Sequence, residues 1–179
     1  SMERLRYLDD VLHGRITLLA SNRKTIADAV GNADLVIGSV LVPGARAPKL
    51  VTADMLGAMK PGTVMVDVAI DQGGCFETSK PTTHSNPTFI VDGVIHYCVT
   101  NMPGAVARTS TLALSAVTVP YGIKLANKGF IEAVTSDAAL GRGVNVMDGL
   151  VTYKGVADAF DLPYTPIEKA IAKHRAAVA

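Results

Sequence analysis

Residues 64–75, which read VMVDVAIDQGGC, are the most informative stretch of this chain. They begin as an apolar run, the pattern of a strand that is buried on both faces of a sheet. The run ends in Asp71, Gln72 and two glycines. In an open α/β sheet, ligands bind just beyond the carboxyl ends of such strands. We therefore expect the Asp71 carboxylate to face a ligand. If it does so, the chain belongs to a dinucleotide-dependent enzyme.

The segments around this stretch alternate between helical and strand patterns. Leu5, Leu8 and Leu12 share one face of an expected helix. Ser21 and Asn22 form a good N-cap for the helix after them, and Asp92-Gly93 is a hairpin-type turn. The elements expected up to residue 99 are a helix over 3–12, a strand over 15–20, a helix over 24–31, a strand over 34–42, a short helix ending near 59, a strand over 64–70, a loop over 71–87, and strands over 89–91 and 94–99.

The order of these elements predicts the fold class. Strands that alternate with helices favour a doubly wound parallel sheet. After Pro103 the pattern becomes mostly helical and begins with a long apolar helix over 110–128, bent at Pro120. We therefore expect an α/β protein with an incomplete Rossmann-type doubly wound parallel sheet and a mostly helical C-terminal segment. The further expected elements are a helix over 130–140, two short strands within 145–153, a helical turn at 156–160 and a helix over 166–177.

Composition excludes several classes of protein. With 49% hydrophobic and 18% charged residues, the chain has ample material for a core. The net charge of +1 is spread without a basic tract, and Trp is absent, so nucleic-acid binding has little support. No membrane-spanning window or signal peptide is evident. Cys75 and Cys98 lack the spacing of a zinc site or a CxxC pair, which predicts packed, reduced thiols, no metal and a cytoplasmic location.

A dinucleotide fold ordinarily opens with a strand, a GxGxxG turn and a helix, followed by an acidic residue on the next strand. The sequence does not contain this series. Its closest approach, Gly141-Arg142-Gly143, follows a helix and lacks the third glycine. From the residues alone, two explanations stay open: the chain binds no dinucleotide, or the turn is encoded upstream.

Three segments of the chain closely resemble the alanine dehydrogenase family of NAD-dependent amino-acid dehydrogenases. They are residues 34–50 (DLVIGSVLVPGARAPKL), 66–77 (VDVAIDQGGCFE) and 97–111 (YCVTNMPGAVARTST). The motif IDQGGCFE is the most telling of the three. The resemblance runs from Glu3 to the C-terminus, and the NAD-binding subunit of proton-translocating transhydrogenases shares the same segments more loosely.

The resemblance implies a two-domain enzyme of which this chain is the C-terminal portion. In the family, the middle of the chain forms the NAD domain, and the first and last parts form the substrate domain. Residues 1–106 then resemble the later part of the NAD-binding Rossmann domain, without its first βαβ unit and glycine-rich turn. Residues 107–179 resemble the returning segment of the substrate domain. The family's N-terminal half, with its catalytic lysine and histidine, would be a required partner, and the family is typically a homo-hexamer.

The resemblance also implies roles for individual residues. It makes Asp71 the catalytic carboxylate beside the nicotinamide ribose and the substrate. It places Val40 and Leu41 on the cofactor wall, Ser21 at the adenine end and Arg4 near the adenosine ribose. The remaining implied NAD contacts are Val68, Ile70, Val99, Asn101 and Met102.

Each of these residues also has a structural interpretation. Asp71 could cap the turn at Gly73-Gly74, and Asn101 could be a turn former. Ser21 could cap a helix, Arg4 could be a solvated helix charge, and Val40 and Leu41 could be core residues. His84 and His96 have no partner at catalytic spacing, so we expect the first on a loop surface and the second in the sheet.

The implied activity is the reversible NAD-dependent oxidative deamination of L-alanine to pyruvate and ammonia, with this chain a fragment that is inactive alone. Two alternatives stay open. One is the NAD-binding subunit of a transhydrogenase. The loop that carries Cys75, Phe76 and Glu77 favours the dehydrogenase over this alternative. The other is a non-catalytic Rossmann-like interaction domain. The presence of Asp71 and Asn101 disfavours it.

Overall fold

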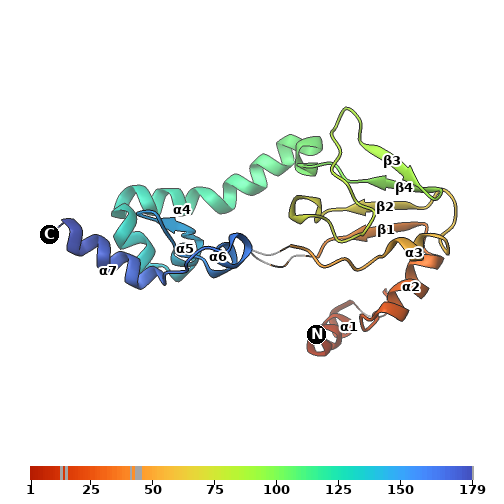
Figure 1. Ribbon diagram of the computed structural model, residues 1–179, viewed down its shortest axis with the longest axis horizontal. Coiled ribbons are helices and arrows are strands. Elements are labelled where there is room, and N and C mark those ends of the chain that lie inside the picture. Colours follow the sequence, from red (N-terminus) through yellow and green to blue (C-terminus); the bar gives the residue numbers. More distant parts are fainter. Residues whose placement is uncertain (13, 15, 41, 43–45, 179) are drawn as a thin grey trace. The chain divides into compact units, whose positions relative to one another are not determined.

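The computed structural model describes residues 1–12, 14, 16–40, 42 and 46–178 (Figure 1). Within these ranges the chain forms two compact units. The first comprises the described residues of 1–40 and 46–101, and the second comprises Val42 and the described residues from Met102 onward.

The first unit is built around a four-stranded sheet of β1 (Leu35–Gly38), β2 (Val64–Asp67), β3 (Thr88–Val91) and β4 (Val94–Tyr97). The strand order is β1-β2-β4-β3 (Figure 1). Strands β1, β2 and β4 are parallel, and β3 returns antiparallel to β4. The Asp92-Gly93 turn between β3 and β4 has two positive φ angles, 49° and 79°, as a tight hairpin requires. The predicted α/β class with a parallel sheet is confirmed.

Besides the sheet, the described residues of this unit form the helices α1 (Met2–Leu12), α2 (Arg23–Asn32) and the short α3 (Ala53–Leu56). Helix α2 starts with a reciprocal cap: the backbone N–H of Thr25 donates to Asn22 Oδ1 at 3.0 Å, and the N–H of Asn22 donates to Thr25 Oγ1 at 3.1 Å. The cap is therefore Asn22 rather than Ser21. The core of this unit includes Leu56, Met65, Phe76 and Val94, each at most 2% exposed.

The strand expected over 15–20 is wrong for its described residues, 16–20, which have no regular structure. A strand needs a neighbour that pairs with its backbone groups. In the sheet order implied by a Rossmann fold this segment would lie beyond two further strands, and the described residues supply neither. Strand β1 is accordingly an edge of the sheet, where Leu35 and Ile37 are 55% and 61% exposed.

The strand expected over 64–70 is shorter than predicted. Strand β2 ends at Asp67, and residues Ile70–Gln72 form a 3₁₀ turn, η1. Asp71 therefore lies in this turn, four residues beyond the last residue of the strand, rather than directly after the strand as expected. The carboxylate that directly ends the strand is Asp67.

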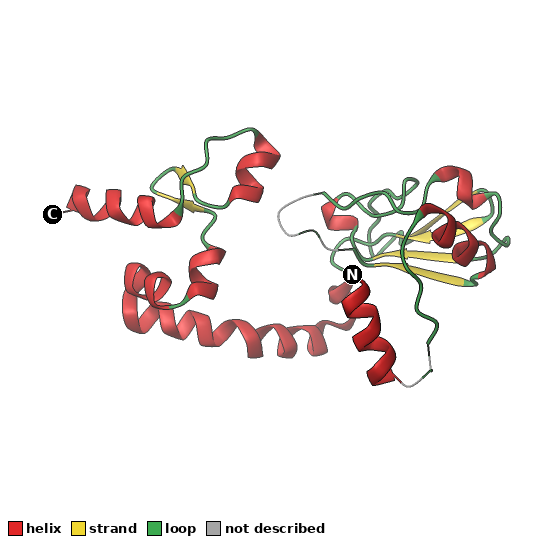
Figure 2. Cartoon of the chain, turned by 90° about the horizontal axis from the view of Figure 1, so that it is seen from below, coloured by secondary structure: helices red, strands yellow, loops and turns green. Residues whose placement is uncertain are grey.

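The second unit begins with the 3₁₀ turn η2 (Met102–Val106) and the long helix α4 (Ala107–Ser136). Pro120 lies inside α4, and the bend expected there stays a prediction. The residue with non-helical backbone inside α4 is Gly129, at φ 73° and ψ 166°, and α4 changes direction near its C-terminal end (Figure 2). Glycine adopts this backbone at no steric cost. The remaining elements are α5 (Ala138–Gly143), β5 (Val146–Met147), β6 (Leu150–Val151), α6 (Lys154–Phe160) and α7 (Ile167–Val178).

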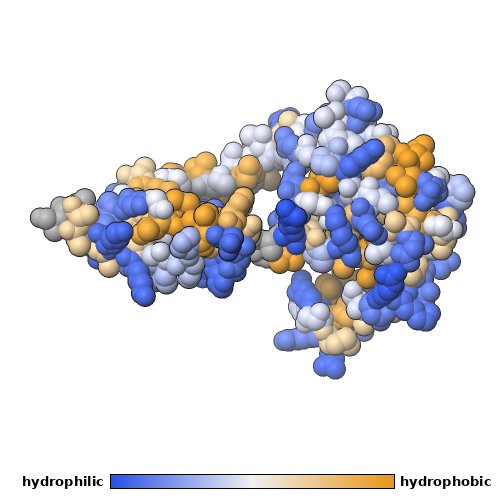
Figure 3. Space-filling view, viewed as in Figure 1, coloured by the Kyte–Doolittle hydropathy of each residue, from blue (hydrophilic) through white to orange (hydrophobic). Residues whose placement is uncertain are grey.

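A second, smaller core holds this unit together. Val134, Val144, Met147, Ala170 and Ile171 pack in one buried cluster. By contrast, apolar side chains along the first part of α4 are exposed, and hydrophobic atoms are visible on the surface of both units (Figure 3). The exposed large side chains of α4 are Leu112, Leu114, Val117, Val119, Tyr121, Ile123 and Phe130.

Candidate functional site

The end of β2 carries a buried carboxylate. Asp67 is fully buried, and both of its oxygens accept hydrogen bonds. Oδ1 accepts from the backbone N–H of Ala69 at 3.1 Å, and Oδ2 accepts from the N–H of Cys75 at 2.9 Å and of Phe76 at 3.3 Å. The hydroxyl of Ser79 donates to Oδ2 as well. Several donors offset the cost of removing this charge from water.

Asp71 lies four residues further on, inside the 3₁₀ turn, and is exposed. Within the described ranges its carboxylate has no hydrogen-bond or ion-pair partner. The turn is closed by backbone bonds from Gln72 N to Ala69 O at 2.9 Å and from Gly73 N to Ile70 O at 3.0 Å. The alternative role of Asp71 as the cap of the Gly73-Gly74 turn therefore has no contact to support it. Its oxygens are available to a ligand.

A lysine holds the same loop from another side. Lys49 Nζ donates to the carbonyl oxygens of Gly73, Gly74 and Phe76, the last two at 2.8 and 3.1 Å. The neighbouring backbone adds bonds from Ala47 N to Gln72 O at 3.1 Å and from Leu50 N to Cys75 O at 2.7 Å. The loop after β2 is thus tied closely to the segment that follows β1.

A cavity of about 350 Å³ lies between α2 and the carboxyl end of β1. It brings together two predicted cofactor residues, Ser21 and Val40, from segments nearly twenty residues apart. Its walls are otherwise mostly apolar, and volumes of this order are typical of small-molecule sites. The further lining residues are Ile26, Ala29, Val30, Val36, Ile37, Gly38, Ser39, Leu50, Val51, Cys75 and Phe76.

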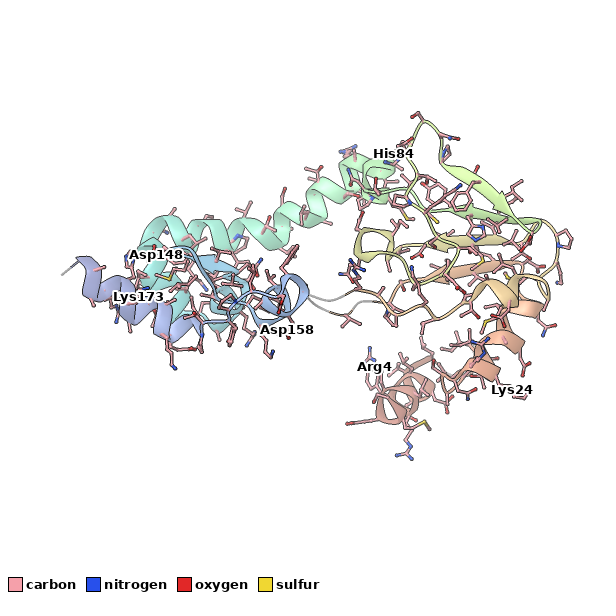
Figure 4. The ribbon with its side chains drawn as sticks, viewed as in Figure 1. Arg4, Lys24, His84, Asp148, Asp158 and Lys173 are labelled. Carbon is pink, nitrogen blue, oxygen red and sulfur yellow. The ribbon has the colours of Figure 1, made fainter. Side chains whose placement is uncertain are left out.

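The other predicted site residues have different environments. Ile70 and Val99 are buried, whereas Val68, three residues before Asp71, is 48% exposed. Arg4 is exposed on α1, where its guanidinium lies 4.6 Å from the Tyr7 ring, and it does not line the cavity (Figure 4). Leu41 lies outside the described residues.

The end of β4 leads into the predicted Asn101-Met102 pair. Asn101 is exposed at φ 56°, a backbone conformation that asparagine tolerates better than most residues, so it does form a turn. Its carbonyl accepts from His84 Nε2 at 3.0 Å, and His84 lies on a surface loop as expected (Figure 4). Met102 is the first residue of η2, in the second unit. The cofactor roles of both residues stay predictions.

The thiols and the buried histidine are structural. Cys75 and Cys98 are buried and free, and burial raises the pKa of Cys75 to about 11, with the charge of Asp67 adding to the effect. A protonated thiol is a poor nucleophile. His96 is buried in β4: Nδ1 lies 3.1 Å from Val94 O and so donates, which leaves Nε2 to accept from Thr78 Oγ1 at 2.8 Å. Among the described residues, no group of three or more His, Cys, Asp or Glu could hold a metal ion.

Comparison with known proteins shows the family to which this chain belongs. Residues 1–154 match the family model described as alanine dehydrogenase/PNT, C-terminal domain. The chain belongs to this alanine dehydrogenase/PNT family. Alanine dehydrogenase of Halomonas elongata is 59% identical over 164 residues, covering 92% of this chain and 44% of the relative. That of Methanococcus maripaludis is 57% identical over 169 residues, covering 94% and 45%.

A solved L-alanine dehydrogenase has the same fold as this member of the family. It is 50% identical, with a TM-score of 0.78, and the match covers 90% of this chain and 44% of that structure. The chain thus spans somewhat less than half the length of the alanine dehydrogenases it matches. In this family member, no helix of the described ranges is both long and apolar enough to cross a membrane.

Sequence reasoning missed Asp67 and Lys49. A signal for Asp67 was present, because a carboxylate inside a buried apolar run needs several donors, and the chain after it is rich in glycine and serine. Lys49 had no comparable signal, since the carbonyls that it contacts become neighbours only when the loop folds back over residues 47–51.

Proposed function

We propose that this chain is the cofactor-side portion of an alanine dehydrogenase, which interconverts L-alanine and pyruvate plus ammonia with reversible hydride transfer to NAD. Identity of 57–59% to relatives of that name supports the proposal. The observation that carries it is the exposed carboxylate of Asp71, which has no partner within the described residues and lies on a loop held at the carboxyl end of a central parallel strand.

The two segments of the chain take different parts in this proposal. We assign residues 1–106 to the later part of the NAD domain and residues 107–179 to the returning segment of the substrate domain. The parallel order of β1, β2 and β4 supports the first assignment. The remaining part of the enzyme would contribute the other cofactor and substrate groups.

The residues present fit a dinucleotide at one end. The cavity beside β1 has mostly apolar walls and two serines, Ser21 and Ser39, a surface suited to the adenosine end of NAD. Val40 would form part of the same wall, and the proposal extends it to Leu41 and adds Arg4 as a nearby charge. Bound NAD supplies the hydride acceptor, as is usual for nicotinamide cofactors. The chain's further proposed contacts are Val68, Ile70, Asp71, Val99, Asn101 and Met102.

Asp71 is the proposed catalytic residue. Its negative charge would favour a cationic amino group at the reacting carbon and hold the substrate in line with the cofactor. Its partner-free position allows this, because a carboxylate already paired within the chain would have to break those bonds first. Asn101, on the turn after β4, offers an amide to the same ligand.

The assay that tests this function uses the full-length protein that contains this chain. We expect reduction of NAD that requires L-alanine, and oxidation of NADH that requires pyruvate and ammonium. Hydride transfer between two dinucleotides without alanine would instead show a transhydrogenase. Absence of both activities, with intact NAD binding in calorimetry, would favour a non-catalytic domain.

The proposed partners are the rest of the enzyme and further copies of it, in a homo-oligomer located in the cytoplasm. Exposed apolar side chains on α4, such as Leu114, Val117 and Ile123, support a subunit contact. Light scattering on the full-length protein would show a mass of several subunits, and a monomer at micromolar concentration would contradict this part of the proposal.

A further inference from the structure

The loop between β2 and Ser79 is held by two opposite charges, and the turn that bears Asp71 lies between their contacts. The Asp67 carboxylate accepts from backbone N–H groups of the loop, while the Lys49 ammonium donates to its carbonyls. The two side chains come from different segments of the first unit. We use the name Asp67–Lys49 clamp for this pair.

The Asp67 half of the clamp joins the two ends of the turn. Its Oδ1 binds the N–H of Ala69, before the turn, and its Oδ2 binds the N–H of Cys75, after it. Gly74 N also donates to Ala69 O at 3.0 Å, which closes the loop at its base. The path of the backbone through Asp71 is therefore set with respect to the end of β2, and Asp67 itself is fully buried.

The Lys49 half fixes the second part of the loop. Three carbonyl oxygens, those of Gly73, Gly74 and Phe76, share one ammonium. Without a cation, three carbonyl oxygens gathered around one point would repel one another through their partial negative charges. Lysine provides three donors on one atom and so matches this arrangement.

The packing at Gly74 shows how closely the clamp fits. Gly74 has φ +74°, and a Cβ there would lie 2.7 Å from Asp67 Oδ2 and 2.9 Å from Ser79 Cβ. Any larger residue would push the backbone away from the carboxylate. Close packing at Gly74 thus constrains the loop backbone, whereas the Asp71 side chain on the same loop has no partner within the described residues.

We propose that Asp67 and Lys49 are positioning residues for the reaction, which act by fixing the turn that carries Asp71. This inference rests on the proposed function. A misplacement of about 1 Å at a reacting group costs on the order of 10²-fold in rate. The clamp is therefore expected to set the turnover rate through Asp71, in addition to any contribution to stability.

A double-mutant cycle in the full-length enzyme tests the proposal. Asp67→Asn keeps the volume but places an amide NH₂ against backbone donors, whichever way the amide lies. We expect kcat for alanine oxidation to fall by about 10²-fold when Asp71 is present. In an Asp71→Asn background, the same change should lower kcat by no more than about two-fold, because residues that act as a unit are non-additive. The loss of melting temperature should be equal in both backgrounds.

The outcomes separate the proposal from a purely structural role. If Asp67→Asn lowers kcat by the same factor with and without Asp71, the positioning role is overturned and the proposed function stands. If Asp71→Asn alone leaves kcat unchanged, the proposed function itself fails and the positioning role fails with it.

Lys49 gives a second cycle if Asp67→Asn does not fold. Lys49 is exposed, so Lys49→Met keeps its aliphatic stem at little risk to the fold. We expect a loss in kcat of about ten-fold that again depends on Asp71. The matched control is Lys60→Met, which removes an exposed lysine paired with Asp34 at 2.9 Å and should leave kcat unchanged. Equal losses for Lys49→Met in both backgrounds would overturn the proposal.

Discussion

Asp67 ends strand β2 and Asp71 lies four residues further on, yet their carboxylates occupy opposite environments. Asp67 is fully buried and accepts hydrogen bonds from three backbone N–H groups and one hydroxyl. Asp71 is exposed and has no partner within the described ranges. A buried, saturated carboxylate can order a loop but cannot approach a ligand, whereas a free one can. Asp67 therefore orders the loop, and Asp71 is the carboxylate that can contact a ligand.

The contact between β1 and the loop after β2 predicts a steric effect at Gly38. A Cβ at this position would lie 2.3 Å from Cys75 Sγ and 2.6 Å from Phe76 Cζ. Gly38→Ala should therefore destabilise the full-length protein by about 1–3 kcal/mol in urea unfolding. Gly57→Ala is the control, because nothing lies within 4 Å of its Cβ position and its φ is −61°. If Gly38→Ala and Gly57→Ala were equally stable, the close packing of Gly38 against Cys75 and Phe76 would be contradicted.

His96 predicts a loss of stability in acid. Burial lowers the pKa of His96 below its ordinary value of 6.5, an effect that Val94 O and the charge of Asp67 oppose and the charge of Lys80 reinforces. The unfolded chain then binds a proton that the folded protein does not, so stability is present above pH 6.5 and falls as the pH drops below it.

The melting temperature, measured at about pH 7.5 and about pH 5.5, checks this sign. Wild-type protein should lose more stability over this interval than His96→Gln, which has no proton to gain. The exposed His84→Gln variant should behave as the wild type does. An identical pH dependence for wild type and His96→Gln would show that His96 does not carry the effect.

The open edge of β1 predicts that this chain is not stable alone. Leu35 and Ile37 are more than half exposed, and one side of the strand has no neighbour within the described residues. An unpaired edge of this kind favours pairing with another chain segment. Circular dichroism of the isolated 179-residue chain should show a broad thermal transition. A sharp cooperative transition with the stability of the full-length enzyme would rule out this dependence.

Much of the fold was predictable because its signals are local. The apolar runs of β1, β2 and β4, the Asp92-Gly93 turn and the Asn22 cap each depend on a few adjacent residues. The strand expected over 15–20 failed for a non-local reason, since an apolar run becomes a strand only where a neighbour pairs with it. The helices expected over 110–128 and 130–140 leave Gly129 between them, and Gly129 is the residue with non-helical backbone inside α4, whereas the bend expected at Pro120 stays a prediction.

The site was predictable in part. The run VMVDVAIDQGGC located the loop of Asp71, and the structure brings Ser21 and Val40 to one cavity. Lys49 could not be assigned its contacts, because the carbonyls that it binds lie 24 to 27 residues further along the chain. The partners of Asp67 lie only 2 to 12 residues away, but they surround its carboxylate only once the loop has folded back. Periodicity reports which face of an element is apolar, but it does not report where a loop returns.

The central claim is that Asp71 performs the chemistry of an alanine dehydrogenase, and Asp71→Asn in the full-length enzyme tests it most directly. Steady-state reduction of NAD by L-alanine should show kcat lowered by about 10²-fold, with the melting temperature unchanged. The matched control is Asp34→Asn, an exposed carboxylate in the same unit whose side chain is 87% exposed, and it should keep full turnover. Wild-type turnover in Asp71→Asn would contradict the account.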